Sequence, residues 1–131
     1  MKQLTRFVLA LTFVVMAPLS AISAEPTVSR AQFTTAVLDR EPTDDLSAIS
    51  LDAERVFFFT ELHHMDGTTV THRWSLNGAV MAEVSFNVRA SRWRVHSSKT
   101  LLPEWRGDWV VDVVDENGVV VETKTVGYSA Q

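Results

Sequence analysis

Apolar and polar residues alternate with a period of two along most of the chain after about residue 28. Such alternation is typical of half-buried β-strands, and spacing typical of helices is hardly visible. The pattern predicts seven strands, over residues 30–38, 55–62, 68–76, 80–88, 92–98, 108–114 and 119–126. Short strands separated by regular turn signals predict an all-β fold, a single antiparallel β-sandwich of immunoglobulin-like type, with a small barrel as the main alternative.

Residues 40–50, REPTDDLSAIS, form the one long loop that we expect between these strands. Pro42 and the acidic residues oppose regular strand pairing. Asp44 or Asp45 is a candidate cap for one short helical turn.

Two Asn-Gly dipeptides, at residues 77–78 and 117–118, lie between apolar runs and predict hairpins. At the first dipeptide, a two-residue turn would mix apolar and polar residues on each face. A three-residue loop with Gly78 in the left-handed conformation makes one face consistently apolar, and we prefer it. It pairs Val80, Ala82 and Val84 with Trp74, His72 and Val70, and it turns Thr71 and Arg73 outward.

Tryptophans occupy three of the apolar strand faces. Trp74, Trp93 and Trp109 are each in phase with the apolar residues of their strand, so we expect all three in the core. Trp105 lies in the turn LLPEWRG, and its position stays open.

The N-terminal segment, MKQLTRFVLALTFVVMAPLSAISA, is typical of a secretory signal peptide. Lys2 and Arg6 precede a short apolar run, which is well below the roughly 20 residues that span a bilayer. We expect cleavage after Ala24, which divides the chain into a signal peptide, 1–24, and one β-sandwich domain, 25–131. The mature protein is then periplasmic or secreted, with no transmembrane anchor after cleavage.

Composition narrows the class of protein further. The chain has no cysteine, so it offers neither a disulfide framework nor a lipidation site, and its stability must come from the core. It has 12 basic and 16 acidic residues, and both basic residues of the signal segment are lost on cleavage. The acidic balance argues against nucleic acid as a partner.

Five stretches stand out by the order and spacing of their residues: FFFTEL, GTTVTHRW, VSFNV, RWRVHSSK and LLPEWRGDWVVDVVD. Together they resemble a bacterial family known as domain of unknown function 2914, over about residues 28–126. The matching positions are Phe59, Thr60, Leu62, Gly67, Val70, His72, Trp74, Arg92, Trp93, Arg94, Ser97, Ser98, Lys99, Leu102, Pro103, Gly107 and Trp109. The family name implies no activity, so the resemblance supplies a class and no mechanism.

The sequence contains no convincing catalytic motif. His96 can share a strand face only with Ser98, because neighbouring residues point to opposite faces, and there is no G-x-S-x-G segment. The glycines are scattered singly and the carboxylates lack ligand spacing, so we expect no catalytic residue and no cofactor. Asp115 and Glu116 are explained by the turn that follows them.

The segment HHMDG, residues 63–67, combines two imidazoles with a thioether, which suits a metal such as copper. His63 and His64 diverge if the strand continues through them, so we favour exposed loop histidines and keep both as weak metal candidates. We expect His72 to be a buried histidine with a hydrogen-bonded ring.

Residues 91–99, SRWRVHSSK, concentrate basic residues in an acidic chain. Strand alternation gathers Arg92, Arg94 and His96 on one face, and Arg73 joins them if the third and fifth strands lie side by side. Arginine binds carboxylate or phosphate in a bidentate manner, although an ordinary solvated face remains the simpler explanation.

Two functional hypotheses follow. We favour a noncatalytic binding or interaction module of the bacterial envelope, whose partner is an anionic glycan, a lipid headgroup or an acidic protein segment. The alternative is a histidine-based metal-binding protein or small enzyme of the periplasm. A pocket in which two histidines and an acid converge would favour the alternative.

Overall fold

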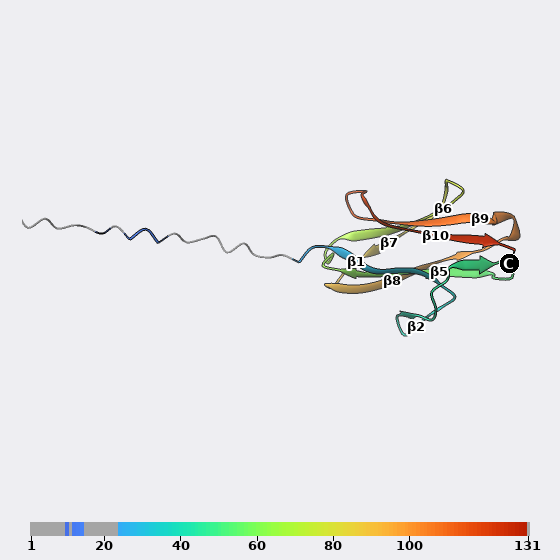
Figure 1. Cartoon of the computed structure of the whole chain (residues 1–131), viewed down its shortest axis with the longest axis horizontal. Helices are drawn as coiled ribbons and strands as arrows, with labels where there is room; N and C mark the ends of the chain where they lie inside the picture. Colours follow the sequence, from blue (N-terminus) through green and yellow to red (C-terminus); the bar gives the residue numbers. More distant parts are fainter. Residues whose placement is uncertain (1–9, 11, 15–23, 131) are drawn as a thin grey trace, which may run out of the picture.

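The computed structural model describes residues 10, 12–14 and 24–130, and nearly all of its regular structure is β-strand. The strands are β1 (Thr27–Thr34), β2 (Val37–Leu38), β3 (Glu41–Pro42), β4 (Ala48–Ser50), β5 (Arg55–His63), β6 (Thr69–Leu76), β7 (Ala79–Asn87), β8 (Arg92–Thr100), β9 (Gly107–Val114) and β10 (Val120–Ser129). One 3-10 helix, η1 (Pro103–Trp105), precedes β9. The other long strands match the predicted ones closely, whereas the strand predicted over residues 30–38 is divided between β1 and the separate β2. The all-β fold is confirmed (Figure 1).

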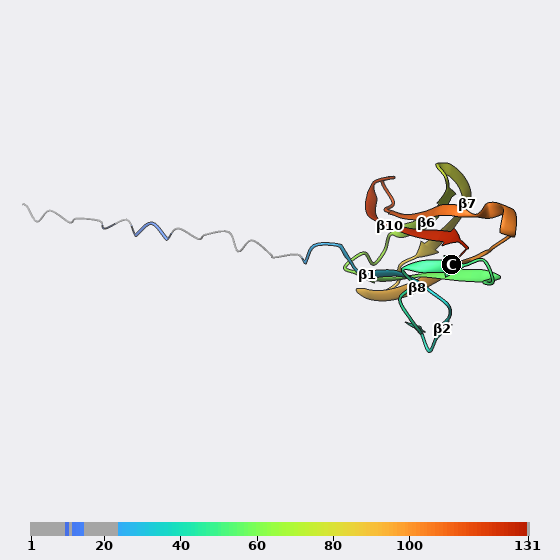
Figure 2. The ribbon, with the colours of Figure 1, turned by 45° about the vertical axis from the view of Figure 1, so that its right-hand side comes forward.

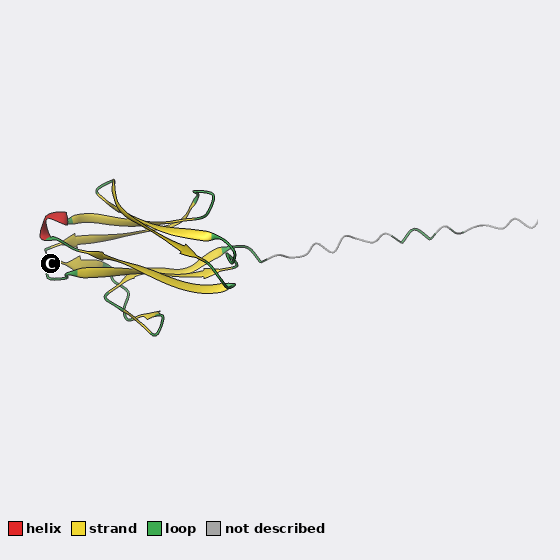
Figure 3. Cartoon of the chain, turned by 180° about the vertical axis from the view of Figure 1, so that it is seen from behind, coloured by secondary structure: helices red, strands yellow, loops and turns green. Residues whose placement is uncertain are grey.

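Two sheets pack face to face as a sandwich (Figures 1 and 3). One has the order β1-β5-β8 and the other the order β4-β10-β9-β6-β7. This is the immunoglobulin-like arrangement, in which the first, second and fifth long strands face the remaining four. The sandwich is not purely antiparallel, because β4 runs parallel to β10. A third, two-stranded sheet, formed by β2 and β3, extends from the outer side of the three-stranded sheet (Figure 2).

The core lies between the two main sheets. Trp74 and Trp109 are fully buried, and their rings meet edge to face with centroids 6.4 Å apart. Both were expected there. Trp93 is only half-buried, because β8 is an edge strand and its ring lies at the rim of the core. Trp105 is also half-buried and packs against Trp109.

The register expected for the first hairpin is wrong, although the predicted faces are right. Asn77 and Gly78 both have positive φ and form a two-residue turn, which favours Asn-Gly because both positions need the left-handed region. A β-bulge at Met81 then shifts the phase of β7 by one residue. It pairs Ala82, Val84 and Phe86 with Trp74, His72 and Val70.

The bulge, and not the turn, therefore gives the hairpin one consistently apolar face. Val70, His72 and Trp74 on that face are all fully buried. The second hairpin places Gly118 at φ +80°. Its Asp115 carboxylate accepts hydrogen bonds from two backbone N–H groups, which confirms the turn chemistry expected of Asp115.

The expectation of a strand-free loop over residues 40–50 is also wrong. Pro42 lies in the short β2–β3 hairpin, where it is tolerated because a two-stranded edge needs few ladder N–H groups. Asp44 caps no helical turn. Its carboxylate instead accepts hydrogen bonds from the Thr34 hydroxyl and the Thr35 backbone N–H, both at 2.7 Å.

The predicted signal peptide falls mainly on residues 1–9, 11 and 15–23, which lie outside the described residues. Within the described part of the chain, no helix has the length and apolar character needed to cross a membrane.

Candidate functional site

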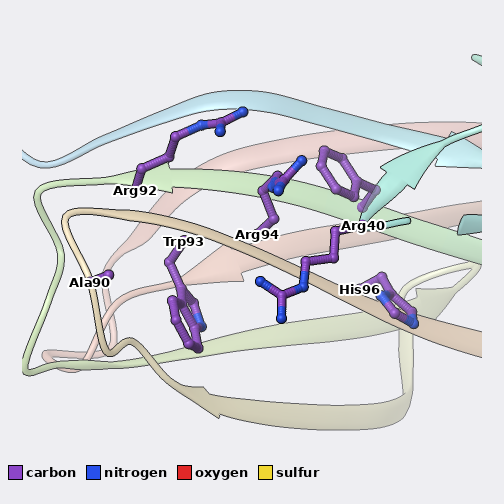
Figure 4. A pocket seen from close by; sticks show the side chains of 7 residues that line it. Arg40, Ala90, Arg92, Trp93, Arg94 and His96 are labelled. Carbon is purple, nitrogen blue, oxygen red and sulfur yellow. The ribbon is translucent and has the colours of Figure 1, made fainter. Parts of the chain in front are cut away.

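A pocket of about 480 Å³ lies over β8, at the outer face and free edge of the three-stranded sheet (Figure 4). Its polar lining consists of the guanidinium groups of Arg40, Arg92 and Arg94 and the imidazole of His96. The described residues that line it include no carboxylate. The pocket therefore offers several cationic donors to an anion.

Strand alternation explains how β8 presents three of these side chains. Val95 and Ser97 are buried on the inner face, whereas Arg92 and His96 are exposed and Arg94 is half-buried. The predicted division of the stripe into two faces is thus what the structure shows. In the view of Figure 4, Arg92 and Arg94 extend to one side of β8 and Trp93 to the other.

Trp93 adds an aromatic surface at the edge of the sheet. Its ring is half-buried and lines the pocket beside Arg92 and Arg94, and the buried Phe59 forms part of the floor. Arginines next to an aromatic surface can bind a ligand that carries both charge and apolar groups.

Arg40 reaches this pocket from the turn of the β2–β3 hairpin, which the sequence did not reveal. Asp39 and Arg40 occupy the two turn positions with φ of 51° and 62°. Non-glycine residues in this region are strained by about 1 to 3 kcal/mol each, and such strain is concentrated at functional sites. Within the described part of the chain, no carboxylate forms an ion pair with Arg40, so its charge is available to a ligand.

Arg73 does not belong to the site. It lies on β6 in the five-stranded sheet, where its Nε donates to Glu83 at 2.9 Å. The third and fifth long strands, β6 and β8, are in different sheets, so the condition for Arg73 to join the stripe is not met.

A network of ion pairs, which the sequence did not predict, borders the pocket. The Arg30 guanidinium donates to both oxygens of Glu41, at 2.7 and 3.0 Å, and to Glu61 at 2.8 Å. Arg92 donates to Glu61 at 2.9 Å, and Arg94 donates to Glu41. The two arginines of β8 are therefore not isolated surface charges. This differs from an ordinary solvated face, because each arginine is paired with a carboxylate of the network.

Glu61 is the buried centre of this network, with 9% of its side chain exposed. Burial raises the pKa of its carboxyl, but hydrogen bonds from His63, Arg30, Arg92 and Ser29 outweigh that effect and hold the pKa well below the ordinary value. Guanidinium donors, Arg30 first and then Arg94, lower the pKa of Glu41 to about 2. Both carboxylates stay ionised at neutral pH.

The charges of this face do not cancel. Four arginines, Arg30, Arg40, Arg92 and Arg94, are grouped around the two carboxylates of the network. The net charge of these six side chains is positive, and three of the four arginines line the pocket. No motif could have shown this, because Arg30, Glu41 and Glu61 come from three separate strands.

The two adjacent histidines form no metal centre with a third ligand. The Nε2 atom of His63 lies 2.7 Å from a Glu61 oxygen, whereas His64 adopts φ of 58° and its ring centroid is 6.1 Å from that of His63. Among the described residues, no cluster of three or more His, Asp or Glu side chains is arranged to hold a metal ion.

A second polar cluster lies inside the core. His72 is fully buried, with Nδ1 at 2.7 Å from the Ser97 hydroxyl and Nε2 at 3.0 Å from the Thr60 hydroxyl. The Trp74 indole N–H also donates to Ser97, at 3.0 Å. The buried, hydrogen-bonded histidine is confirmed, and all four residues are among those that carry the family resemblance.

This cluster has the Ser–His pairing of a nucleophile and base, but not the other properties that such chemistry needs. Burial, with a smaller effect of the His96 charge, lowers the pKa of His72 to about 3. A base that weak is poorly matched to neutral pH, and Ser97 is only 6% exposed. The arrangement instead satisfies polar groups in the core and connects the two sheets.

Comparison with known proteins agrees with the resemblance noted above. Residues 67–126, from the turn before β6 to the middle of β10, match the model of a family described as Protein of unknown function (DUF2914). This match supports the suspected family over the second half of the sandwich, from β6 to β10, and does not extend to residues 28–66. No match to the chain is found among the curated proteins.

Proposed function

We propose that this protein is an exported, noncatalytic binding module of the bacterial cell envelope, and that the pocket over β8 binds an anionic group of its partner. The partner is a glycan, a lipid headgroup or an acidic protein segment. The observation that carries the proposal is the convergence of Arg40, Arg92, Arg94 and His96 on one pocket, which borders an aromatic ring.

Three features of this pocket support binding over ordinary solvation. The arginines of β8 are fixed by Glu41 and Glu61, so less conformational entropy is lost when a ligand binds. Arg40 has no carboxylate partner in the described part of the chain, and it lines the pocket from the turn of the β2–β3 hairpin. The positive charge is local, in a chain that is acidic overall.

Arg40→Gln tests the proposal most directly, because it removes a pocket charge without breaking an ion pair of the network. We expect the variant to fold normally and to bind anionic probes at least about tenfold more weakly, since a hydrogen bond to a charged group contributes about 1.5 to 3 kcal/mol and each 1.4 kcal/mol is a factor of ten. Suitable probes are polyglutamate, polygalacturonate and vesicles that contain phosphatidylglycerol. Lys124→Gln is the matched control, because it removes one exposed charge from the other sheet.

Salt dependence provides a second criterion. Binding to the pocket should weaken between 50 and 300 mM salt in the unaltered protein, and less so in Arg40→Gln. If the unaltered protein binds none of the three probes, or if Lys124→Gln weakens binding as much as Arg40→Gln does, the proposal is wrong.

Export rests on the N-terminal sequence and has its own test. We expect the protein isolated from its native cells to begin at or near Glu25, because the basic start, short apolar run and small residues before that position suit signal peptidase. Intact-mass measurement checks this. A native protein that retains residues 1–24 in a membrane fraction would contradict it.

A further inference from the structure

The strand that carries the pocket also has an unpaired edge. β8 ends the β1-β5-β8 sheet, and within the described part of the chain only β5 pairs with it. An edge strand presents a row of free backbone N–H and C=O groups, which is a template for another strand.

Two hydrogen bonds beyond the ends of the strand pair show which backbone groups are free. The His64 N–H donates to the Ser91 carbonyl at 2.7 Å, and the Leu101 N–H donates to the Glu54 carbonyl at 2.9 Å. Both pairs continue the β5–β8 register. Because hydrogen-bonded residues alternate along an antiparallel strand, and Ser91 and Leu101 are two of them, the residues of β8 whose backbone bonds to β5 are the odd-numbered ones. The backbone groups of the even-numbered residues therefore point away from β5. These residues are Arg92, Arg94, His96, Ser98 and Thr100.

The free backbone groups thus belong to the same residues whose side chains form the basic row. A strand added to this edge would place every second side chain beside Arg92, Arg94 and His96 on the outer face. Its remaining side chains would lie on the inner face, next to the exposed part of Trp93 at the rim of the core.

We propose that β8 binds an extended segment of a partner protein as an added strand, and that this segment alternates acidic and apolar residues. The inference rests on the proposed function and selects the acidic protein segment from its possible partners. Main-chain hydrogen bonds supply affinity, and the alternation of charge selects the register. Arg40, which overhangs the same pocket, supplies a further positive charge beside the added strand.

Charge also argues against a second copy of this chain as the added strand. If the β8 edges of two copies paired, the basic side chains of one copy would lie opposite or next to those of the other. Like charges opposite one another are destabilising. The three arginines of the pocket thus oppose self-pairing and favour an acidic strand.

Three peptides of equal length and charge separate strand addition from simple attraction. The first, TEVEVET, has the expected alternation. The second, TEEEVVT, has the same composition without the alternation. The third is TEVEVET with the three glutamate amides N-methylated, which keeps the charges but removes the N–H groups that would face β8 in an antiparallel added strand.

We expect TEVEVET to bind at least tenfold more tightly than either of the other two, and Arg40→Gln to weaken it more than Lys124→Gln does. At saturation, amide hydrogen exchange at Arg94, His96 and Ser98 should slow at least tenfold. Sedimentation of the free protein should show a monomer.

Each contrary result has a distinct meaning. Equal binding of all three peptides overturns strand addition and leaves the anion pocket standing, as does binding of polygalacturonate or anionic vesicles without binding of TEVEVET. A dimer whose exchange is already slow along β8 overturns the choice of partner. Failure of every anionic probe overturns the proposed function as well.

Discussion

The hydroxyl of Ser97 on β8 lies 2.7 Å from Nδ1 of His72 on β6, so the hydrogen bond between them joins the two sheets across the core. Thr60 on β5 extends this connection on the other side of the ring. Apolar contacts do not select one orientation of the two sheets as strictly as directional hydrogen bonds do. Buried polar groups of this kind make a core specific when all are satisfied.

Ser97→Ala should destabilise the fold considerably, because it removes a hydrogen-bond partner of both His72 and the Trp74 indole. Each buried polar group left unpaired costs about 1 to 3 kcal/mol in the free energy of unfolding. Urea unfolding measures the loss. Ser98→Ala, one residue along and on the outer face, is the matched control and should cost less than about 1 kcal/mol, because it loses only an exposed hydrogen bond from Arg55. Equal losses in the two variants would contradict the role of the cluster.

The stability of the protein should fall as the pH decreases from about 6.5. The unfolded chain protonates His72 near its ordinary pKa of 6.5, whereas burial lowers the pKa in the folded state to about 3. Within that interval the unfolded state binds the extra proton, so stability decreases by up to about 1.4 kcal/mol per pH unit as the pH falls.

His72→Phe tests this pH dependence because it removes the titrating ring and retains an aromatic side chain. The difference in unfolding free energy between the two proteins should change by roughly 1 to 2 kcal/mol between pH 6.5 and 5, and the carboxylates are the same in both proteins. His63 and His64 remain in both proteins, so their contributions cancel, and only the smaller effect of the His96 charge is lost together with the His72 ring. A constant difference across this interval would show that His72 does not remain neutral.

Glu61→Gln should cost about 1 to 3 kcal/mol, because the nearly buried carboxylate is the common acceptor for Arg30, Arg92 and His63. Thermal and urea unfolding measure the change. Glu83→Gln breaks the exposed pair with Arg73 and should cost less than about 1 kcal/mol. If the two substitutions were equally mild, the network would not be what orders the arginines of the pocket.

Trp109→Ala should bring the protein close to unfolding, with a loss of about 3 to 5 kcal/mol, the range for a buried large aromatic side chain. A domain of this size has a total stability of about 5 to 15 kcal/mol. Trp105→Ala is the comparison, because Trp105 is half-buried and should cost less. Similar melting temperatures for Trp109→Ala and the unaltered protein would contradict this assignment of the core.

Much of the fold could be predicted from local patterns alone. Period-two alternation located the long strands, and it assigned Val70, His72 and Trp74 inward and Arg92 and His96 outward. These assignments held because a strand has only two faces, and burial of one face forces the choice. The turn at Asn77 was also visible, since few residues other than Asn and Gly adopt positive φ readily.

Only the tertiary structure decided which strands pair and which side chains lie next to one another. The bulge at Met81 depends on how β7 fits the core, so the pairing of β6 with β7 was not readable from the turn. Sheet membership separated Arg73 from Arg92, because the order of strands depends on contacts between residues far apart in the chain. The same contacts brought Arg40 over β8 and placed the Glu61 carboxylate beside four hydrogen-bond donors, from Ser29, Arg30, His63 and Arg92. The sequence by itself thus determined which side chains face out, and only packing of distant strands decided which of them meet to form a site.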